Sequence, residues 1–283
     1  MGSLAKKLGQ LSRKSLESES AHLFKTIKAN KMEGSLSQAL DGTLKQGHDM
    51  RIFGLGTMAS MESRERYQRF LANLHAVYST MEEELDATSI PAIRSDTIRA
   101  VWMHHGDILR RSDALAQDLE ELQSLLDSST KAIRVSPCTL NYLQAIRWAG
   151  EEDRETGGGR LLGHLYCRYF ADLFGGQMLG KPYALALQLP QTPRHLRFEL
   201  EVGRKAYLEH LYTDINKAGK LLTKTQFQEV VDESLLAFRH NVNIYSEEPK
   251  MVTSAIKGGM NLVLGWTTSY GKTKATTDDS KKG

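Results

Sequence analysis

His164-Leu-Tyr-Cys-Arg-Tyr-Phe-Ala-Asp-Leu-Phe-Gly-Gly-Gln177 is the stretch of sequence that says most about the fold of this chain. Apolar residues recur at spacings of three and four from Leu161 to Leu173, which predicts a helix. Gly175 and Gly176 stand where that helix should continue, although each glycine in a helix interior costs about 1 kcal/mol relative to alanine. Two consecutive glycines indicate a kink, or a backbone that a flat and bulky group approaches closely.

Three polar residues follow the same helix at intervals of four: His164, Arg168 and Asp172. A polar row that runs into a glycine break on an otherwise apolar helix is typical of the wall of a ligand pocket. Two plainer interpretations stay open. Arg168 and Asp172 have the spacing of an ordinary surface ion pair, which stabilises a helix by a few tenths of a kcal/mol, and His164 can be purely structural.

The composition describes an ordinary globular protein. The chain has 283 residues, of which 40% are hydrophobic and 25% charged, and its net charge of +3 gives no support to nucleic-acid binding. Cys138 and Cys167 match no metal-site spacing and form no disulfide framework, so we expect an intracellular protein, in the cytosol or in an organelle such as a plastid or mitochondrion. No window of about 20 apolar residues occurs, so we predict no transmembrane helix.

Three regions differ in composition. Residues 1–34 are rich in Ser and Lys and are expected to be an extension that serves targeting or is disordered, although Glu17 and Glu19 interrupt the acid-poor pattern of a targeting segment. Residues 267–283 are almost devoid of apolar side chains and are expected to be a disordered polar tail. Residues 35–266 are expected to form one domain.

Helical spacing dominates that domain. Beyond the opening helix, apolar periodicity predicts helices at 36–48, 67–85, 113–126, 137–148, 198–216 and 225–245. The acidic run Glu82–Glu84 is interpreted as a solvated helix face. Because no convincing alternating strand occurs, the fold class is predicted to be all-α, with a single domain.

His48 continues the apolar stripe of the first of these helices, Leu36, Leu40 and Leu44, at the same spacing. A histidine at the end of an apolar stripe faces the interior. It is either a buried side chain bonded to a backbone carbonyl, or a ligand to a metal or to heme iron, for which neutral imidazole is a common ligand.

Taken together, these motifs resemble the heme oxygenase family. Residues 36–48 look like the proximal helix of that family, with His48 at the axial-ligand position, and residues 74–85 and 109–119 resemble two further family segments. Residues 166–177 resemble its distal helix, whose usual form is Tyr-Thr-Arg-Tyr-Leu-Gly-Asp-Leu-Ser-Gly-Gly-Gln. The motif Ala237-Phe-Arg-His-Asn241 falls where its last long helix is expected.

The resemblance implies a fold and a reaction. Heme would lie between the His48 helix and the 161–179 helix, as both cofactor and substrate, and would be opened by dioxygen to biliverdin, carbon monoxide and ferrous iron. The electrons would come from an external donor, a ferredoxin or a reductase. Asp172 would hold water that delivers protons, and Arg168 and Tyr78 would complete its network, although Tyr78 also lies on an apolar stripe that predicts core packing. The implied cofactor-binding residues are Tyr166, Ala171, Gly175, Gly176 and Lys45.

This chain departs from the family pattern around the expected heme. Ala171 replaces a glycine and Phe174 a serine on the distal helix, and Ile52 stands where a glutamate often supports the proximal histidine. The positions that usually bind the two propionates with Lys or Arg read Asp41, Glu209 and Thr213, so that Lys45, with Arg204 or Lys205, would have to substitute. These departures leave open a second hypothesis: a non-catalytic relative that acts as a heme binder or as a scaffold or assembly protein.

Overall fold

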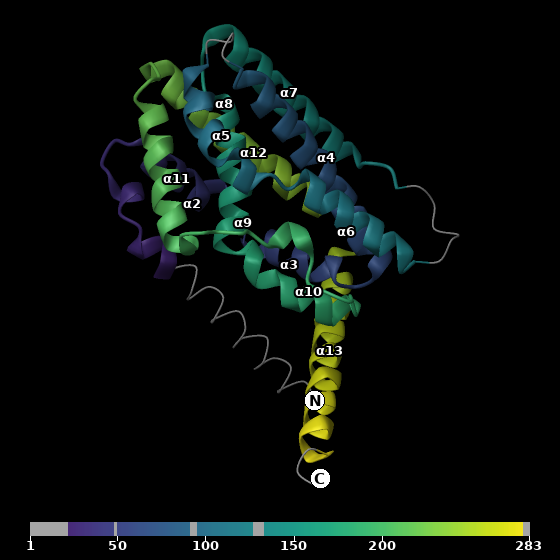
Figure 1. Ribbon diagram of the computed structural model, residues 1–283. Coiled ribbons are helices and arrows are strands. Elements are labelled where there is room, and N and C mark those ends of the chain that lie inside the picture. The colour runs from purple at the N-terminus through teal and green to yellow at the C-terminus, as the bar shows by residue number, and fades with distance from the viewer. Residues whose placement is uncertain (1–21, 48–49, 91–94, 127–132, 280–283) are drawn as a thin grey trace.

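The computed structural model of the protein describes residues 22–47, 50–90, 95–126 and 133–279 (Figure 1). Every regular element in this part of the chain is helical, as the sequence predicted. The α-helices are α2 (Leu36–Gly47), α3 (Met50–Ser60), α4 (Arg64–Thr88), α5 (Asp96–Leu109), α6 (Ser112–Ser124), α7 (Pro137–Thr156), α8 (Arg160–Leu165), α9 (Ala171–Phe174), α10 (Gly180–Leu187), α11 (Gly203–Gly219), α12 (Lys224–Glu247) and α13 (Met251–Asp279). The short elements are the 3-10 helices η1 (Ala29–Lys31), η3 (Gly176–Leu179) and η4 (Arg194–Leu196) and the π-helix η2 (Tyr166–Phe170).

The core of the domain is built on α4, which packs along α7 and α6 (Figure 1). The side chain of Ser63 accepts a hydrogen bond from the amide of Arg66 and so begins α4, and Pro137 occupies the first turn of α7, where a missing amide proton costs little. One stripe of α4 is fully buried, and each of these side chains stabilises the fold by about 1.5–3 kcal/mol. The stripe consists of Tyr67, Leu71, Val77, Met81 and Leu85.

Helix α12 crosses the domain and contacts α8, α2 and α7. It begins with a capping box in which Thr223 and Gln226 bond each other's backbone amides. The approach of α8 is close enough to require glycine: a Cβ built on Gly163 would lie 2.7 Å from the amide nitrogen of Ser234 and 2.8 Å from the carbonyl oxygen of Val230. The glycine-broken helix is therefore held directly on the backbone of α12.

Residues 22–34, the described part of the expected N-terminal extension 1–34, pack against the domain instead of lying outside it. Leu23 and Ile27 are buried in the core, and the Glu209 carboxylate accepts the backbone amides of Lys28 and Ala29 at 2.9 and 2.8 Å. Apolar side chains and a polar anchor on α11 thus bind residues 22–34 to the domain. Residues 1–21 lie outside the described part.

The C-terminal tail expected to be disordered over residues 267–283 also differs, because α13 continues through it to Asp279 and projects from the body (Figure 1). Its first half packs on α3 and α10 through two glycines. A Cβ on Gly258 would lie 1.8 Å from the carbonyl oxygen of Met58, and one on Gly265 would lie 2.3 Å from that of Leu185. A helix nucleated by such packing extends without the cost of a new nucleus.

Two other local expectations are corrected. The helix predicted at 198–216 begins only at Gly203, whose φ of +73° marks a left-handed start. Glu82 is not on a solvated face: it is buried, and its carboxylate accepts the amides of Arg111 and Ser112 and the hydroxyl of Tyr169. A buried carboxylate with this many donors fixes the junction between α5 and α6, which sequence spacing does not reveal.

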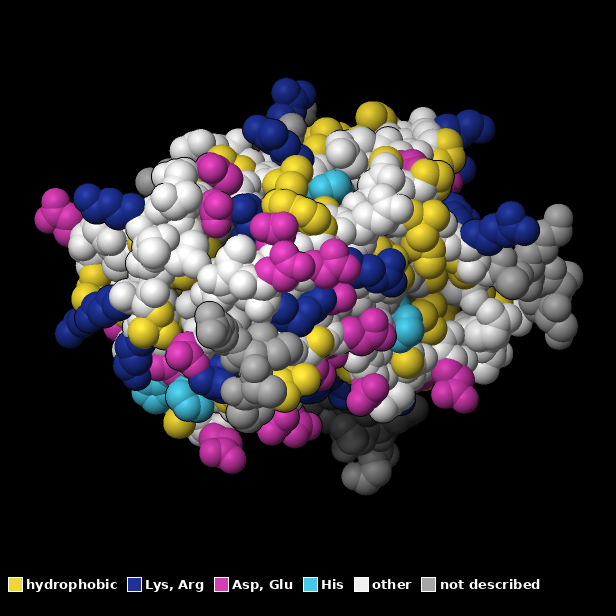
Figure 2. Space-filling view, turned by 90° about the horizontal axis from the view of Figure 1, so that it is seen from above, with side chains coloured by type: hydrophobic (Ala, Val, Ile, Leu, Met, Phe, Trp, Pro, Cys, Tyr) yellow, Lys and Arg dark blue, Asp and Glu magenta, His cyan; other side chains and the backbone are white. Residues whose placement is uncertain are grey.

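The surface seen in Figure 2 carries basic and acidic side chains interspersed rather than gathered in separate patches. Such mixing leaves no strong field of one sign over this face. Among the described helices, none combines the length and the apolar composition needed to cross a bilayer.

Candidate functional site

The glycine-broken helix is divided into four pieces: α8, the π-helix η2, α9 and the 3-10 helix η3. A π-turn inserts an extra residue into the helical repeat and rotates the faces that follow it. The row expected from the sequence is therefore split. His164 faces α12, where its Nε2 lies 3.0 Å from the Glu233 carboxylate, and its Nδ1 lies 3.3 Å from the Tyr142 hydroxyl. His164 is thus structural, as the plainer interpretation held.

Asp172, Tyr78 and Arg168, the three residues expected to be catalytic, are brought together. The Tyr78 hydroxyl donates to Oδ2 of Asp172 and accepts from Nη2 of Arg168 at 3.1 Å. The Arg168 guanidinium lies over the Tyr78 ring, 5.0 Å from its centroid, and donates through Nη1 to Oδ1 of Asn241 at 2.7 Å. Arg168 and Asp172 meet through Tyr78 in a buried network, so the interpretation as a surface pair is wrong.

Burial sets the protonation of this network. Burial raises the pKa of Tyr78 well above its ordinary value, so the phenol stays protonated and its hydroxyl donates a hydrogen bond to the Asp172 carboxylate. Arg168 is buried as well, and its Nε has no hydrogen-bond partner among the described residues. Asp172 is half-buried, which places a held carboxylate at the edge of the network.

Ala171 and Gly175, one helical turn apart, form a face of this helix without large side chains. Ala171 is exposed, and a Cβ built on Gly175 would meet only the Ala171 carbonyl oxygen, at 3.5 Å. Gly176 differs from the expectation, because it is buried and turned towards Asp172 and Leu196. The open face, which we call the ligand face, is therefore Ala171 and Gly175, with Asp172 beside it.

Phe174, the second residue of this helix that departs from the family pattern, packs inside the domain. Its ring packs against Phe24 of the N-terminal segment and against Phe170, with centroid distances of 5.7 and 6.3 Å. Both are aromatic contacts within the domain. Phe174 thus joins the N-terminal segment to the distal helix.

Tyr166 has an unexpected partner: its hydroxyl donates to Oδ1 of Asp41 on α2 at 2.6 Å. The Tyr212 hydroxyl on α11 donates to the same oxygen at 2.9 Å. Asp41 therefore binds the distal helix directly. Of the other two residues expected on the proximal side, His48 lies outside the described residues, and Lys45 lies on α2 with a side chain outside the description.

Asn241, Tyr212 and Asn30 belong to these two networks and were not predicted as site residues. Asn241 could have been predicted from the sequence, because it is the last residue of the family motif at 237–241. Tyr212 carries no such signal, because it is 171 residues from Asp41. Asn30 is 11 residues from Asp41, but it lies in the segment that was expected to be an extension outside the domain.

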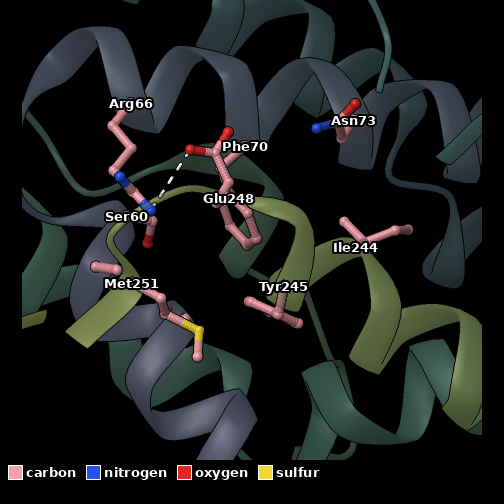
Figure 3. Close-up of a pocket in the computed structure, with 10 residues that line it drawn as sticks. Ser60, Arg66, Phe70, Asn73, Ile244, Tyr245, Glu248 and Met251 are labelled. Atoms are coloured by element: carbon pink, nitrogen blue, oxygen red, sulfur yellow. Dashed lines mark ion pairs between the residues drawn. The ribbon is translucent and has the colours of Figure 1, made fainter. Parts of the chain in front are cut away.

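A hollow of about 340 Å³ lies near this site, between α3, α4 and α12 (Figure 3). Tyr245 lines it, with Arg66 and Glu248 across from the ring. The Arg66 guanidinium donates to the Pro249 carbonyl at 3.1 Å and pairs with Glu248 at 3.5 Å. These contacts fix the turn between α12 and α13 beside the hollow.

Asp153 caps the start of the glycine-broken helix. Its carboxylate accepts the amides of Arg160 and Leu161 at 2.8 and 2.9 Å. Desolvation by burial raises its pKa to about 7, although the two amides lower it.

We expect Asp153 to make stability fall with rising pH. Between about pH 4, where an unfolded aspartate titrates, and pH 7, the folded state holds a proton that the unfolded state has released. The free energy of unfolding therefore falls by up to about 1.4 kcal/mol per pH unit over this range. Urea unfolding from pH 4 to 8 measures this slope. It should be shallower in Asp153→Asn and unchanged in Asp232→Asn, and equal slopes in all three proteins would contradict the assignment.

Comparison with known proteins identifies the family. The heme oxygenase family profile matches residues 35–247. Heme oxygenase 2 of Rattus norvegicus is 28% identical over 217 residues, which are 75% of this chain and 65% of the rat protein. The chain thus spans slightly less than two thirds of the length of that relative.

Two solved structures resemble the fold. Heme oxygenase from Leptospira interrogans superposes with a TM-score of 0.62 at 25% identity, over 76% of this chain and all of that one. Heme oxygenase-2 from Synechocystis, solved in complex with heme and NO, gives a TM-score of 0.62 at 24% identity, over 82% of this chain and 92% of that one. The predicted resemblance is confirmed: because the profile covers well over half of the sequence, the chain belongs to the heme oxygenase family.

Proposed function

We propose that this chain is a heme oxygenase, which uses dioxygen and electrons to cleave heme to biliverdin, carbon monoxide and ferrous iron. The observation that carries the proposal is the Asp172–Tyr78–Arg168 network beside the open ligand face of Ala171 and Gly175. A carboxylate oriented at the edge of a face without side chains suits proton delivery to a flat ligand.

The described residues fit heme on this side. A planar macrocycle can lie close to a helix where the side chains are small, and Ala171 and Gly175 provide such a place. His48 would hold the iron from the opposite side, as the sequence predicts. Bound heme would supply the redox chemistry, because no side chain of this site can activate dioxygen.

The protein would supply orientation and protons. Tyr78 donates to Oδ2 of Asp172, and Oδ1 of the same carboxylate would hold a water molecule. Arg168 fixes Tyr78 in turn, by the hydrogen bond to its hydroxyl and by contact with its ring. In this proposal, Asp172 would pass a proton from water to a group bound on the ligand face.

Electrons would come from outside the chain, from a ferredoxin or a reductase. Cys138 and Cys167, the two cysteines of the chain, lack the spacing of an iron–sulfur site, and Cys167 is buried. The donor and this chain would share a compartment, which we expect to be the cytosol or an organelle.

Hemin titration followed by reduction tests the function. Purified protein should develop a Soret band with hemin, and ascorbate or a ferredoxin system should then convert this band into biliverdin absorption. A stable Soret band under reduction would instead identify a non-catalytic heme binder. The absence of a Soret band would refute heme binding and, with it, the proposed function.

A further inference from the structure

Three donors from separate segments converge on the carboxylate of Asp41. The hydroxyls of Tyr166 and Tyr212 donate to Oδ1 at 2.6 and 2.9 Å, and Nδ2 of Asn30 donates to Oδ2 at 2.9 Å. Asp41, Tyr166, Tyr212 and Asn30 are all at least nine-tenths buried. Donors that satisfy both oxygens of one carboxylate define a carboxylate-binding site.

The site lies at one edge of the ligand face. Asp41 lies on α2, the helix that precedes the expected iron ligand His48 in the sequence. Tyr166 precedes Ala171 on the distal helix. The hydrogen bond between Tyr166 and Asp41 joins α2 to the distal helix directly, so we expect a flat ligand held between these helices to end at this contact.

The three donors are built around the carboxylate by tertiary contacts. Tyr212 packs edge-on against Phe170 of the distal helix, with centroids 4.7 Å apart. Asn30 is held through its neighbours Lys28 and Ala29, whose amides bind Glu209. The Asn30 Oδ1 is buried and has no hydrogen-bond partner in the part of the chain that the structure describes, so the hydrogen bond to Asp41 orients this side chain.

We propose that Asn30, Tyr166 and Tyr212 form a carboxylate-binding site that Asp41 occupies with its own side chain. A phenol hydroxyl has one proton to donate, and both hydroxyls donate theirs to Asp41. A carboxylate on the ligand can then bind at this edge only by displacing Asp41. The proposal rests on the proposed function, in which the ligand is heme, a molecule with two carboxylates.

The consequence is a ligand preference. The chain should not distinguish a tetrapyrrole whose propionates are free from one whose propionates are esterified, because the donors at this edge are already used. Removing the internal carboxylate should create that distinction, since the freed hydroxyls and the Asn30 amide could then bind a propionate.

Hemin and hemin dimethyl ester, titrated against the full chain and followed at the Soret band, test the proposal. We expect the unmodified protein to bind both within about 3-fold, and Asp41→Ala to bind hemin at least about 10-fold more tightly while its affinity for the ester is unchanged. Asp41→Asn keeps an oxygen acceptor for the two hydroxyls and should give a much smaller gain. Glu120→Ala removes an exposed charge on α6 and should change neither affinity.

The outcomes separate this proposal from the function it rests on. If the unmodified protein binds hemin at least 10-fold more tightly than the ester, the proposal that Asp41 occupies the carboxylate-binding site is wrong, and the proposed function is unaffected. Equal gains in hemin affinity in Asp41→Asn and Asp41→Ala would show that only the charge of Asp41 affects binding, and would also refute the proposed carboxylate site. Binding of hemin by Asp41→Ala alone would support the carboxylate site and refute the function, and no binding by any variant would refute both. The comparison of the two ligands on the unmodified protein needs no variant to fold.

Discussion

Replacing Asp172 by alanine is expected to lower the rate of biliverdin formation by roughly 100-fold or more, the usual contribution of a positioned acid–base group. The Asp172 carboxylate is the one group of the network that is both held by Tyr78 and placed beside the open turn of Ala171 and Gly175. Alanine leaves no oxygen to hold water there. Single-turnover spectra of the hemin complex under reduction would measure the rate.

Hemin affinity separates a loss of chemistry from a loss of the site. The Asp172→Ala protein should bind hemin within about 3-fold of the unmodified protein, because the substitution leaves Ala171 and Gly175 of the ligand face unchanged. Asp232→Ala, which removes a carboxylate from α12, is the matched control and should leave turnover unchanged. Unchanged turnover in Asp172→Ala would remove Asp172 from the reaction.

Replacing Gly163 by alanine is expected to reduce the free energy of unfolding by about 3 kcal/mol. The added methyl carbon would lie 2.7 Å from the Ser234 amide nitrogen and 2.8 Å from the Val230 carbonyl oxygen, and both are backbone atoms that move only if α8 and α12 separate. This strain outweighs the gain of about 1 kcal/mol that alanine normally brings to a helix. Urea unfolding followed by circular dichroism measures the change.

Gly54→Ala is the matched control, because Gly54 is also helical and a Cβ there meets no described atom within 4 Å. It should stabilise the protein by about 0.5–1 kcal/mol. Equal effects of the two substitutions would contradict the close approach of α8 and α12. The Gly163 variant should also lower the rate of hemin turnover, because the packing of the distal helix on α12 positions Arg168 against Asn241.

Local sequence determined the helices and the family. The apolar spacing of α2, α4 and α12 and the Pro137 start of α7 are properties of neighbouring residues, so they can be predicted without the fold. The distal motif likewise identifies Arg168, Asp172 and the glycines, because their residue types and order are its signature.

Tertiary structure decided which side chains meet. Asp41 and Tyr166 are 125 residues apart, and Tyr78 and Asp172 are 94 apart, so no periodicity could pair them. The π-turn at η2 separates His164 from Arg168, although their spacing predicts a common face. A buried polar group must form a hydrogen bond, and its partner is whichever polar group the packing of another segment brings near it. Tertiary packing therefore selected each of these partners. The sequence by itself thus determined the family and the residues of the distal motif, and only the fold brought the Asp41 carboxylate to the Tyr166 hydroxyl of the distal helix.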